Sequence, residues 1–303
     1  MRKSLIAFTL AMAAPAPAQA PVSPVSKLTE PQDDYPAVSP DGRSILFQSN
    51  RGGNWQLWQM NADGTGLKQL TSGPMNDRQP AWSPDGSKVA FSSDRGQQAG
   101  NRAIFVTGWP FGSTSILQMS KGSGQDVHPK WLPDGSGLIF NRISADGKQA
   151  DVHVVTLDRA ERMIDLGAGL NTYASVDPTG RSLIYRGTTA EAGPNGSVDN
   201  SDVFVAAFDG TNKRRLTIDP AFDGWPAFSP DGMKIAFASR QGGDKFRVFL
   251  MASEGGEATP VEAPAGYHYT QPAWAPDGKS LVVYRWNADS AGEAGQLVRI
   301  TLP

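Results

Sequence analysis

A phrase of eight residues recurs six times in this sequence, and this repetition constrains the fold more than any other feature. The clearest copy is Gln-Pro-Ala-Trp-Ser-Pro-Asp-Gly at residues 79–86. The six copies occupy residues 35–42, 79–86, 128–135, 173–180, 225–232 and 271–278, and the fourth has diverged but keeps its register. A phrase repeated at intervals of roughly 45 to 50 residues is typical of propeller blades or solenoid turns.

Each copy ends in turn-forming residues and is followed by a strand. Pro presets φ for the first corner, Asp bonds the backbone two residues on, and Gly accepts the positive φ that closes the turn. The apolar runs that follow, such as residues 44–47 and 88–91, have the pattern of strands buried on both faces. A third strand, such as residues 56–60, and a second turn at Asp63-Gly64 lead to a weak outer strand. Four antiparallel strands in each of six repeats predict an all-β, six-bladed β-propeller.

The repeats fill one predicted domain, residues 19–303. We place them near residues 33–71, 77–120, 126–166, 171–217, 223–261 and 269–303. The last repeat stops after its third strand, while residues 24–29 resemble an outer strand. Residues 22–30 are therefore expected to complete the last blade and close the ring, which removes exposed sheet edges.

The first residues have the pattern of a cleavable signal peptide. Arg2 and Lys3 precede an apolar run at residues 5–13, and small residues offer cleavage after Ala18 or after Ala20. Because cleavage after Ala20 would leave Pro21 as the first residue, we expect the signal peptide to be residues 1–18. No other apolar run is long enough to cross a membrane. The sequence thus predicts a periplasmic or secreted protein without membrane insertion.

Charge and cysteine content limit the partners. The chain has 28 Lys and Arg against 30 Asp and Glu, with a formal net charge of −2, and it lacks a basic stripe. Nucleic acid is therefore not an expected partner. The chain has no Cys, so it offers neither a disulfide nor a lipid-anchor site. Nothing in the sequence indicates an obligate oligomer, and we expect a monomer.

The repeat resembles the PD40, or WD40-like, repeat of TolB-like propellers, and the resemblance covers essentially the whole mature chain. TolB carries an α/β domain before its propeller, and in prolyl-oligopeptidase relatives a similar propeller precedes a hydrolase domain. We expect neither domain here, and the sequence has no Gly-x-Ser-x-Gly motif. The resemblance implies an envelope role, because the propeller of TolB binds a peptidoglycan-associated lipoprotein. Propellers as a class carry many unrelated activities.

Aligning the repeats places three sets of side chains on one face of the ring, around the mouth of a central channel. An acidic set lies three residues before the first Pro of the phrase: Asp33, Asp77, Asp126, Asn171 and Asp223, with Tyr269 in the last repeat. A variable set lies directly before that Pro: Tyr35, Gln79, His128, Tyr173, Trp225 and Gln271. An Arg follows each second strand: Arg51, Arg95, Arg142, Arg186, Arg240 and Arg285.

The acidic and arginine sets have two interpretations. In the first, each Asp pairs with the Arg of its own repeat and helps to hold the blades together. In the second, the acids hold a divalent cation, because carboxylate oxygens suit Ca²⁺ or Mg²⁺. The sequence matches no dedicated calcium loop, and it predicts no other cofactor.

The variable set has the composition of a recognition surface. Tyr35, Tyr173 and Trp225 offer flat apolar faces, and the other three members offer hydrogen bonds, a mixture that suits a peptide segment or a sugar. Packing between blades is the alternative role for these aromatic residues. The longest loops, residues 187–200 and 286–295, and a smaller insertion at 96–100 belong to the same face. Such insertions indicate a binding side, or they are tolerated at the surface.

The sequence therefore predicts a non-catalytic binding module whose channel mouth holds a protein segment, with an envelope lipoprotein as the favoured partner. The alternative is an enzyme that acts on a carbohydrate or small ligand, with His128, His268, Gln271 and an Arg as candidates. Some polysaccharide lyases with TolB-like propellers hold a divalent metal with channel histidines, whereas His153 is assigned to a strand. A sensor of a small metabolite is the third hypothesis.

Overall fold

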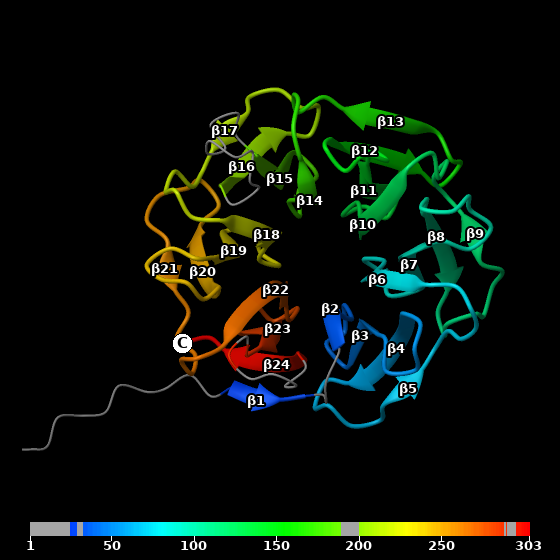
Figure 1. Ribbon diagram of the computed structural model, residues 1–303, viewed down its shortest axis with the longest axis horizontal. Coiled ribbons are helices and arrows are strands. Elements are labelled where there is room, and N and C mark those ends of the chain that lie inside the picture. Colours follow the sequence, from blue (N-terminus) through cyan, green and yellow to red (C-terminus); the bar gives the residue numbers. More distant parts are fainter. Residues whose placement is uncertain (1–24, 29–32, 189–199, 288, 290–294) are drawn as a thin grey trace, which may run out of the picture.

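The computed structural model describes residues 25–28, 33–188, 200–287, 289 and 295–303. They form six four-stranded antiparallel sheets arranged as blades around a common centre (Figure 1). The described part of the chain contains no helix, and hence none that could span a membrane. The prediction of an all-β, six-bladed propeller is confirmed. The predicted signal peptide lies outside the described residues.

Within each blade, the strands are counted outward from the centre of the ring. The innermost strands are β2 (Asp33–Val38), β6 (Asp77–Trp82), β10 (Gln125–Trp131), β14 (Thr172–Val176), β18 (Asp223–Phe228) and β22 (His268–Trp274). The second strands are β3 (Ser44–Ser49), β7 (Lys88–Ser93), β11 (Gly137–Ile143), β15 (Ser182–Thr188), β19 (Lys234–Ser239) and β23 (Ser280–Trp286). The third strands are β4 (Gln56–Asn61), β8 (Ala103–Gly108), β12 (Ala150–Thr156), β16 (Ser201–Ala207), β20 (Arg247–Ala252) and β24 (Gln296–Thr301). The outer strands are β5 (Lys68–Gln69), β9 (Leu117–Gln118), β13 (Glu161–Ile164), β17 (Arg214–Arg215), β21 (Thr259–Pro260) and β1 (Val25–Lys27).

The first strand of the chain closes the ring. β1 pairs antiparallel with β24, from Val25 opposite Ile300 to Lys27 opposite Val298 (Figure 1). The pairing continues in Leu28, whose N–H donates to the carbonyl oxygen of Leu297 at 2.9 Å. The Leu28 side chain is buried against the interface of the sixth and first blades. The expected closure by the N-terminal strand is confirmed.

The repeated Pro-Asp-Gly turn joins the first strand of each blade to the second. In the first blade, Gly42 has a φ of 71° and its N–H donates to the carbonyl oxygen of Ser39 at 2.9 Å. Asp41 Oδ1 accepts from the hydroxyl of Ser39 at 2.6 Å and from the N–H of Arg43 at 3.0 Å. Glycine adopts this left-handed conformation without a steric penalty. The turn therefore keeps one geometry while the strands around it vary.

The hydrophobic core lies between neighbouring blades. Phe47, Phe91, Phe140 and Phe237 occupy the same position of four second strands, and all four are almost completely buried. A further interblade contact comes from the Trp of the repeated phrase. Its indole N–H donates to a carbonyl oxygen of the preceding blade, at 3.1 Å from Trp82 to Ala37 and at 3.2 Å from Trp131 to Ala81. The repeated phrase thus builds the turn and also joins adjacent blades.

Candidate functional site

Six residues, one from each blade, share a left-handed backbone conformation at the centre of the ring. Their φ values are 52° for Tyr35, 55° for Gln79, 54° for His128, 56° for Tyr173, 53° for Trp225 and 55° for Gln271. Positive φ is uncommon outside glycine and costs on the order of 1–3 kcal/mol at each residue. These residues are the variable set of the sequence analysis, and we call them the mouth ring.

A β-bulge in every innermost strand explains this conformation. In the first blade, the register shifts between Asp34 and Ala37, which leaves Tyr35 and Pro36 outside the ladder. Proline has no N–H to donate, so it is accommodated at such an irregularity. The fourth blade has Ala174 in place of Pro and still shifts register. A bulge redirects a side chain, and here it turns the mouth ring toward the centre.

Side-chain carbonyl groups of the preceding blade hold the backbone amides of four mouth-ring residues. The N–H groups of Tyr35, Gln79, His128 and Tyr173 donate to Gln271 Oε1 at 2.7 Å, Gln48 Oε1 at 2.8 Å, Gln79 Oε1 at 3.0 Å and Asn141 Oδ1 at 2.8 Å, respectively. A buried amide without a partner costs free energy, so these bonds stabilise the strained conformation. The acceptors Gln48 and Asn141 were not predicted from the sequence.

Replacing Asn141 by Leu tests this support. Asn141 is fully buried, and its Nδ2 also donates to the carbonyl oxygen of Asn171 at 3.1 Å. Asn141→Leu keeps the volume but leaves the Tyr173 N–H and this carbonyl unpaired, so we expect the free energy of unfolding to fall by about 2–4 kcal/mol. Urea unfolding measures this free energy. The exposed Asn54→Leu serves as the control, and an equal loss in both variants would contradict the structural role of Asn141.

The mouth-ring side chains line a central pocket together with the prolines of the repeated phrase. The space within it, including its open mouth, is about 550 Å³. Tyr35 Oη lies 3.2 Å from His128 Nε2 and 3.5 Å from Tyr173 Oη, and the His128 and Tyr173 rings pack with centroids 4.1 Å apart. Burial, followed by the charge of Lys130, lowers the pKa of His128 to about 3, so its imidazole is neutral at pH 7. We call this space the channel pocket.

Aromatic rings continue from the channel pocket toward the fifth and sixth blades. Trp225 packs 5.4 Å from Tyr173, 5.3 Å from Phe222 and 5.5 Å from Phe246, measured between ring centroids. Phe246 is buried beneath Trp225, and the latter contact is edge-to-face. Phe222 and Phe246 were not predicted to support the site, although Phe222 directly precedes the acidic position Asp223. These ring contacts, which we call the aromatic row, hold Trp225 in place beside the channel pocket.

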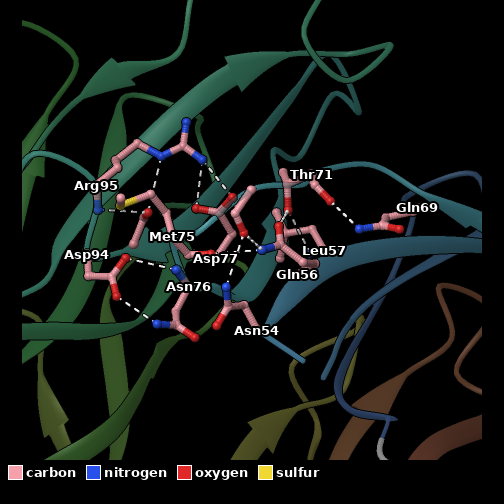
Figure 2. Close-up of polar contacts among 12 residues, drawn as sticks. Asn54, Gln56, Leu57, Gln69, Thr71, Met75, Asn76, Asp77, Asp94 and Arg95 are labelled. Atoms are coloured by element: carbon pink, nitrogen blue, oxygen red, sulfur yellow. Dashed lines mark hydrogen bonds and ion pairs between the residues drawn. The ribbon is translucent and has the colours of Figure 1, made fainter. Parts of the chain in front are cut away.

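The acidic set is buried within the blades and does not line the channel pocket, which corrects the expected position at the mouth. In the first three blades, Asp33, Asp77 and Asp126 pair with Arg51, Arg95 and Arg142, as the first interpretation predicts. Figure 2 shows the second-blade pair, in which Arg95 Nη2 donates to both oxygens of Asp77 at 2.7 and 2.6 Å. Beside it, both oxygens of Asp94 accept bonds from Asn76 at 2.8 Å.

The last three blades do not form these ion pairs. Their arginines lie over aromatic rings, as those of the first three blades also do. Arg186 lies over Phe222 at 4.6 Å, Arg240 over Phe246 at 4.5 Å and Arg285 over Tyr267 at 4.3 Å. Asn171 and Tyr269 carry no charge to pair with, and Arg240 lies over the Phe246 ring, a contact that is favourable for a cation, without an ion pair to Asp223 in the described part of the chain. The predicted pairing is therefore wrong for the fifth blade, and the fourth and sixth blades have no Asp at this position.

Asp223 makes the stability of the protein dependent on pH. Its carboxyl is fully buried, and burial, with smaller contributions from the charges of Asp219 and Asp202, raises its pKa to about 7. A raised carboxyl pKa stabilises the fold below pH 4, and this contribution is lost as the pH rises through 7. We expect the free energy of unfolding of Asp223→Asn to be close to that of the wild type at pH 4 and to exceed it by roughly 2–4 kcal/mol at pH 8. Denaturant unfolding at both pH values measures these free energies. If the free energy of unfolding changed with pH by the same amount in both proteins, this prediction would be wrong.

The structure separates the three histidines. His128 lines the channel pocket, whereas His268 is buried outside it, stacks on Trp286 with ring centroids 4.6 Å apart and accepts the N–H of Phe246 at Nδ1. His153 lies in β12, with Nδ1 3.4 Å from Glu161 Oε1. His268 is therefore not one of the residues that line the channel pocket with His128. Within the described ranges, no three His, Asp or Glu side chains are grouped so that they could hold a metal ion.

Lys130 is the residue of the channel pocket that sequence reasoning missed. It lies two residues after His128 on β10 and lines the pocket. The equivalent residues of four other blades are alanines, Ala37, Ala81, Ala227 and Ala273. The only signal in the sequence was this single charge at a small-residue position. Of the predicted binding loops, residues 189–199, 288 and 290–294 lie outside the described residues.

Comparisons with known proteins agree with the architecture. The sequence profile of a family described as "TolB beta propeller domain" matches residues 25–192 and 195–297. The uncharacterized peptidase YuxL of Bacillus subtilis is 41% identical over 58 residues, which are 19% of this chain and only 9% of that protein's length.

Two solved structures of low sequence identity share the fold. TolB from Acinetobacter baumannii superimposes with a TM-score of 0.62 at 22% identity, and the match covers 84% of this chain and 57% of that one. An oligogalacturonate lyase in complex with manganese gives a TM-score of 0.58 at 15% identity, with 93% of each chain covered. At such identities the likeness shows the fold alone, and proteins with this fold differ in function.

Proposed function

This chain belongs to the TolB β-propeller domain family, and from that premise we propose that it is a non-catalytic binding module whose channel mouth holds a segment of a partner protein. One observation carries the proposal: six strained residues, one per blade, converge on a single pocket. Strain of this kind persists where the surrounding structure fixes it, and it is concentrated at functional sites. The three aromatic members supply flat apolar contact area, and the two amides and His128 supply polar groups.

The predicted signal peptide and the family together favour a place in the cell envelope, with an envelope lipoprotein as the partner. A polypeptide segment suits the pocket because Tyr and Trp provide large contact areas at a low cost in conformational entropy. The aromatic row beneath Trp225 makes that surface rigid before a partner arrives. Rigid contact surfaces of this kind raise affinity by lowering the cost of ordering.

Affinity capture tests the proposal. The mature protein is immobilised and exposed to detergent-solubilised envelope of its native host, beside the double variant Trp225→Ala, Tyr173→Ala. A second double variant, Ile218→Ala, Met233→Ala, removes two exposed apolar side chains outside the pocket and serves as the control. We expect one envelope protein to be retained by the wild type and the control and to be lost by the first variant. Equal retention by all three baits would reject the channel mouth as the binding site.

The alternative is an enzyme that acts on a carbohydrate or small ligand at the same pocket. The observation that favours it is the contact between Tyr35 Oη and the neutral His128 at 3.2 Å, because paired hydroxyl and imidazole groups can transfer protons. Metal analysis after dialysis separates the two functions, since a metal-assisted lyase would retain a divalent ion. A screen of polysaccharides for turnover would complete the comparison.

A further inference from the structure

Lys130 places one positive charge in the channel pocket. Its side chain reaches solvent through the channel, yet protein atoms surround it closely, and this desolvation lowers the pKa of its ammonium group. Among the described residues, none forms a hydrogen bond or an ion pair with that ammonium. A charge in such surroundings gains most from a partner of opposite charge, because attraction strengthens as water is excluded.

One more polar group of the pocket-lining residues has no hydrogen-bond partner in the described part of the chain. It is the buried atom Trp225 Nε1. The indole nitrogen can only donate a hydrogen bond. This group therefore favours a ligand that accepts hydrogen bonds.

Three positive charges act on His128 in the pocket. Lys130, Arg186 and Arg102 all act on His128 to disfavour its positive form. Among the described residues that line the pocket there is no Asp or Glu, and the nearby Asp34 interacts with Gln48 and Arg78. The surroundings thus favour an anion over a cation.

The form of the anion follows from what the pocket lacks. Five of the six positions that follow the mouth ring are prolines, which have no N–H, so the rim cannot supply the cluster of backbone donors that a phosphate group prefers. A single ammonium with one neutral donor matches a singly charged carboxylate, which accepts several bonds with its two oxygens.

We propose that the channel pocket binds a carboxylate of the partner polypeptide, with Lys130 Nζ as its counter-ion and Trp225 Nε1 as a hydrogen-bond donor. The proposal rests on the proposed function, because it specifies which group of the bound segment enters the pocket. That carboxylate belongs to an Asp or Glu side chain or to a chain terminus, and the two sources can be distinguished with small probes.

The test uses nuclear magnetic resonance of the Trp225 indole N–H in the ¹⁵N-labelled mature protein. The signal is assigned by its loss in Trp225→Phe. Three probes are titrated: acetyl-Gly-Glu-Gly-amide, acetyl-Gly-Gly-Gly with a free C-terminus, and the neutral acetyl-Gly-Gln-Gly-amide. We expect one or both acidic probes to shift the signal and the neutral probe to leave it unchanged. Response to the first probe indicates a side-chain carboxylate, and response to the second indicates a C-terminus.

Substitution of Lys130 completes the test. Lys130→Met keeps the length of the side chain without its charge, and we expect it to weaken acidic-probe binding at least about 10-fold. Lys234→Met removes an exposed lysine outside the pocket and should leave the affinity unchanged. Equal affinity of wild type and Lys130→Met, or binding of the neutral Gln probe as tight as that of both acidic probes, would overturn the proposal. Binding of galacturonate in place of both acidic peptides would also overturn it, because the carboxylate would then come from a sugar.

The two proposals can fail separately. If affinity capture retains a protein through Trp225 and Tyr173 while Lys130→Met has no effect on probes or capture, only the carboxylate assignment is wrong. If the acidic peptides bind through Lys130 while capture yields no protein that depends on the mouth ring, the binding-module function is wrong.

Discussion

Deletion of residues 21–30 is expected to lower the melting temperature of the mature protein by roughly 10 °C or more. The deletion removes β1, so the backbone of β24 between Val298 and Ile300 loses its partner strand. It also removes Leu28 from the interface of the sixth and first blades. Together these losses amount to about 5 kcal/mol, from one buried Leu and several strand hydrogen bonds.

Differential scanning calorimetry of two truncated proteins measures this effect. The control lacks only residues 21–24 and retains β1, and it should melt within about 2 °C of the full mature protein. Exposing the edge of β24 should also promote self-association, which size-exclusion chromatography detects. A protein without residues 21–30 that melts like the control would show that β1 does not close the ring.

The double substitution Trp225→Ala, Tyr173→Ala is expected to weaken partner binding by about 100-fold or more, because aromatic residues at the centre of an interface each contribute about 2 kcal/mol or more. The fold should remain intact, since both side chains face the pocket and are only half-buried. Alanine also meets no new strain, because the native residues already have positive φ at these positions.

Isothermal titration calorimetry with the captured partner provides the affinity, and circular dichroism provides the melting temperature of the same samples. The Ile218→Ala, Met233→Ala variant should retain wild-type affinity. Unchanged affinity in the Trp225→Ala, Tyr173→Ala protein would place the binding face elsewhere on the propeller. A large fall in its melting temperature would instead assign these two rings to the core.

The architecture was predictable because it depends on local chemistry that the chain repeats. The Gly of each turn, such as Gly42, marks a positive φ that few other residues tolerate, so six such signals fix the number of blades. The closing strand was predictable for a similar reason. The last repeat lacks an outer strand, and residues 24–29 have the pattern that supplies it.

The backbone of the mouth ring was not predictable. An aromatic residue before Pro, as in Tyr35-Pro36, ordinarily indicates an extended conformation. The left-handed conformation depends instead on a bulge and on acceptors from the preceding blade, such as Gln271 for Tyr35. These residues are far apart in the sequence, so no local pattern reveals the contact. Repeat alignment therefore identified which side chains surround the centre but not how they are held there.

The absence of the ion pair in the fifth blade was not predictable for a related reason. Alignment gives Asp223 and Arg240 the same positions as Asp77 and Arg95, yet only the latter pair forms. Arg240 lies over Phe246 at 4.5 Å, and Arg95 lies over Phe91 at 5.1 Å while it also pairs with Asp77, so neither the repeat position nor the ring reveals which pair forms. Lys130 was overlooked because it occupies a position where the repeat otherwise uses small scaffold residues.

Site-specific photo-crosslinking in the native host tests whether the channel mouth binds an envelope protein. A photoreactive phenylalanine analogue is introduced at position 225 in the channel pocket, and at position 233, an exposed site outside it, in a separate protein. We expect irradiation to join position 225 to one envelope polypeptide and position 233 to yield no such product. A product from position 233 alone, or the same product from both positions, would contradict binding at the channel mouth.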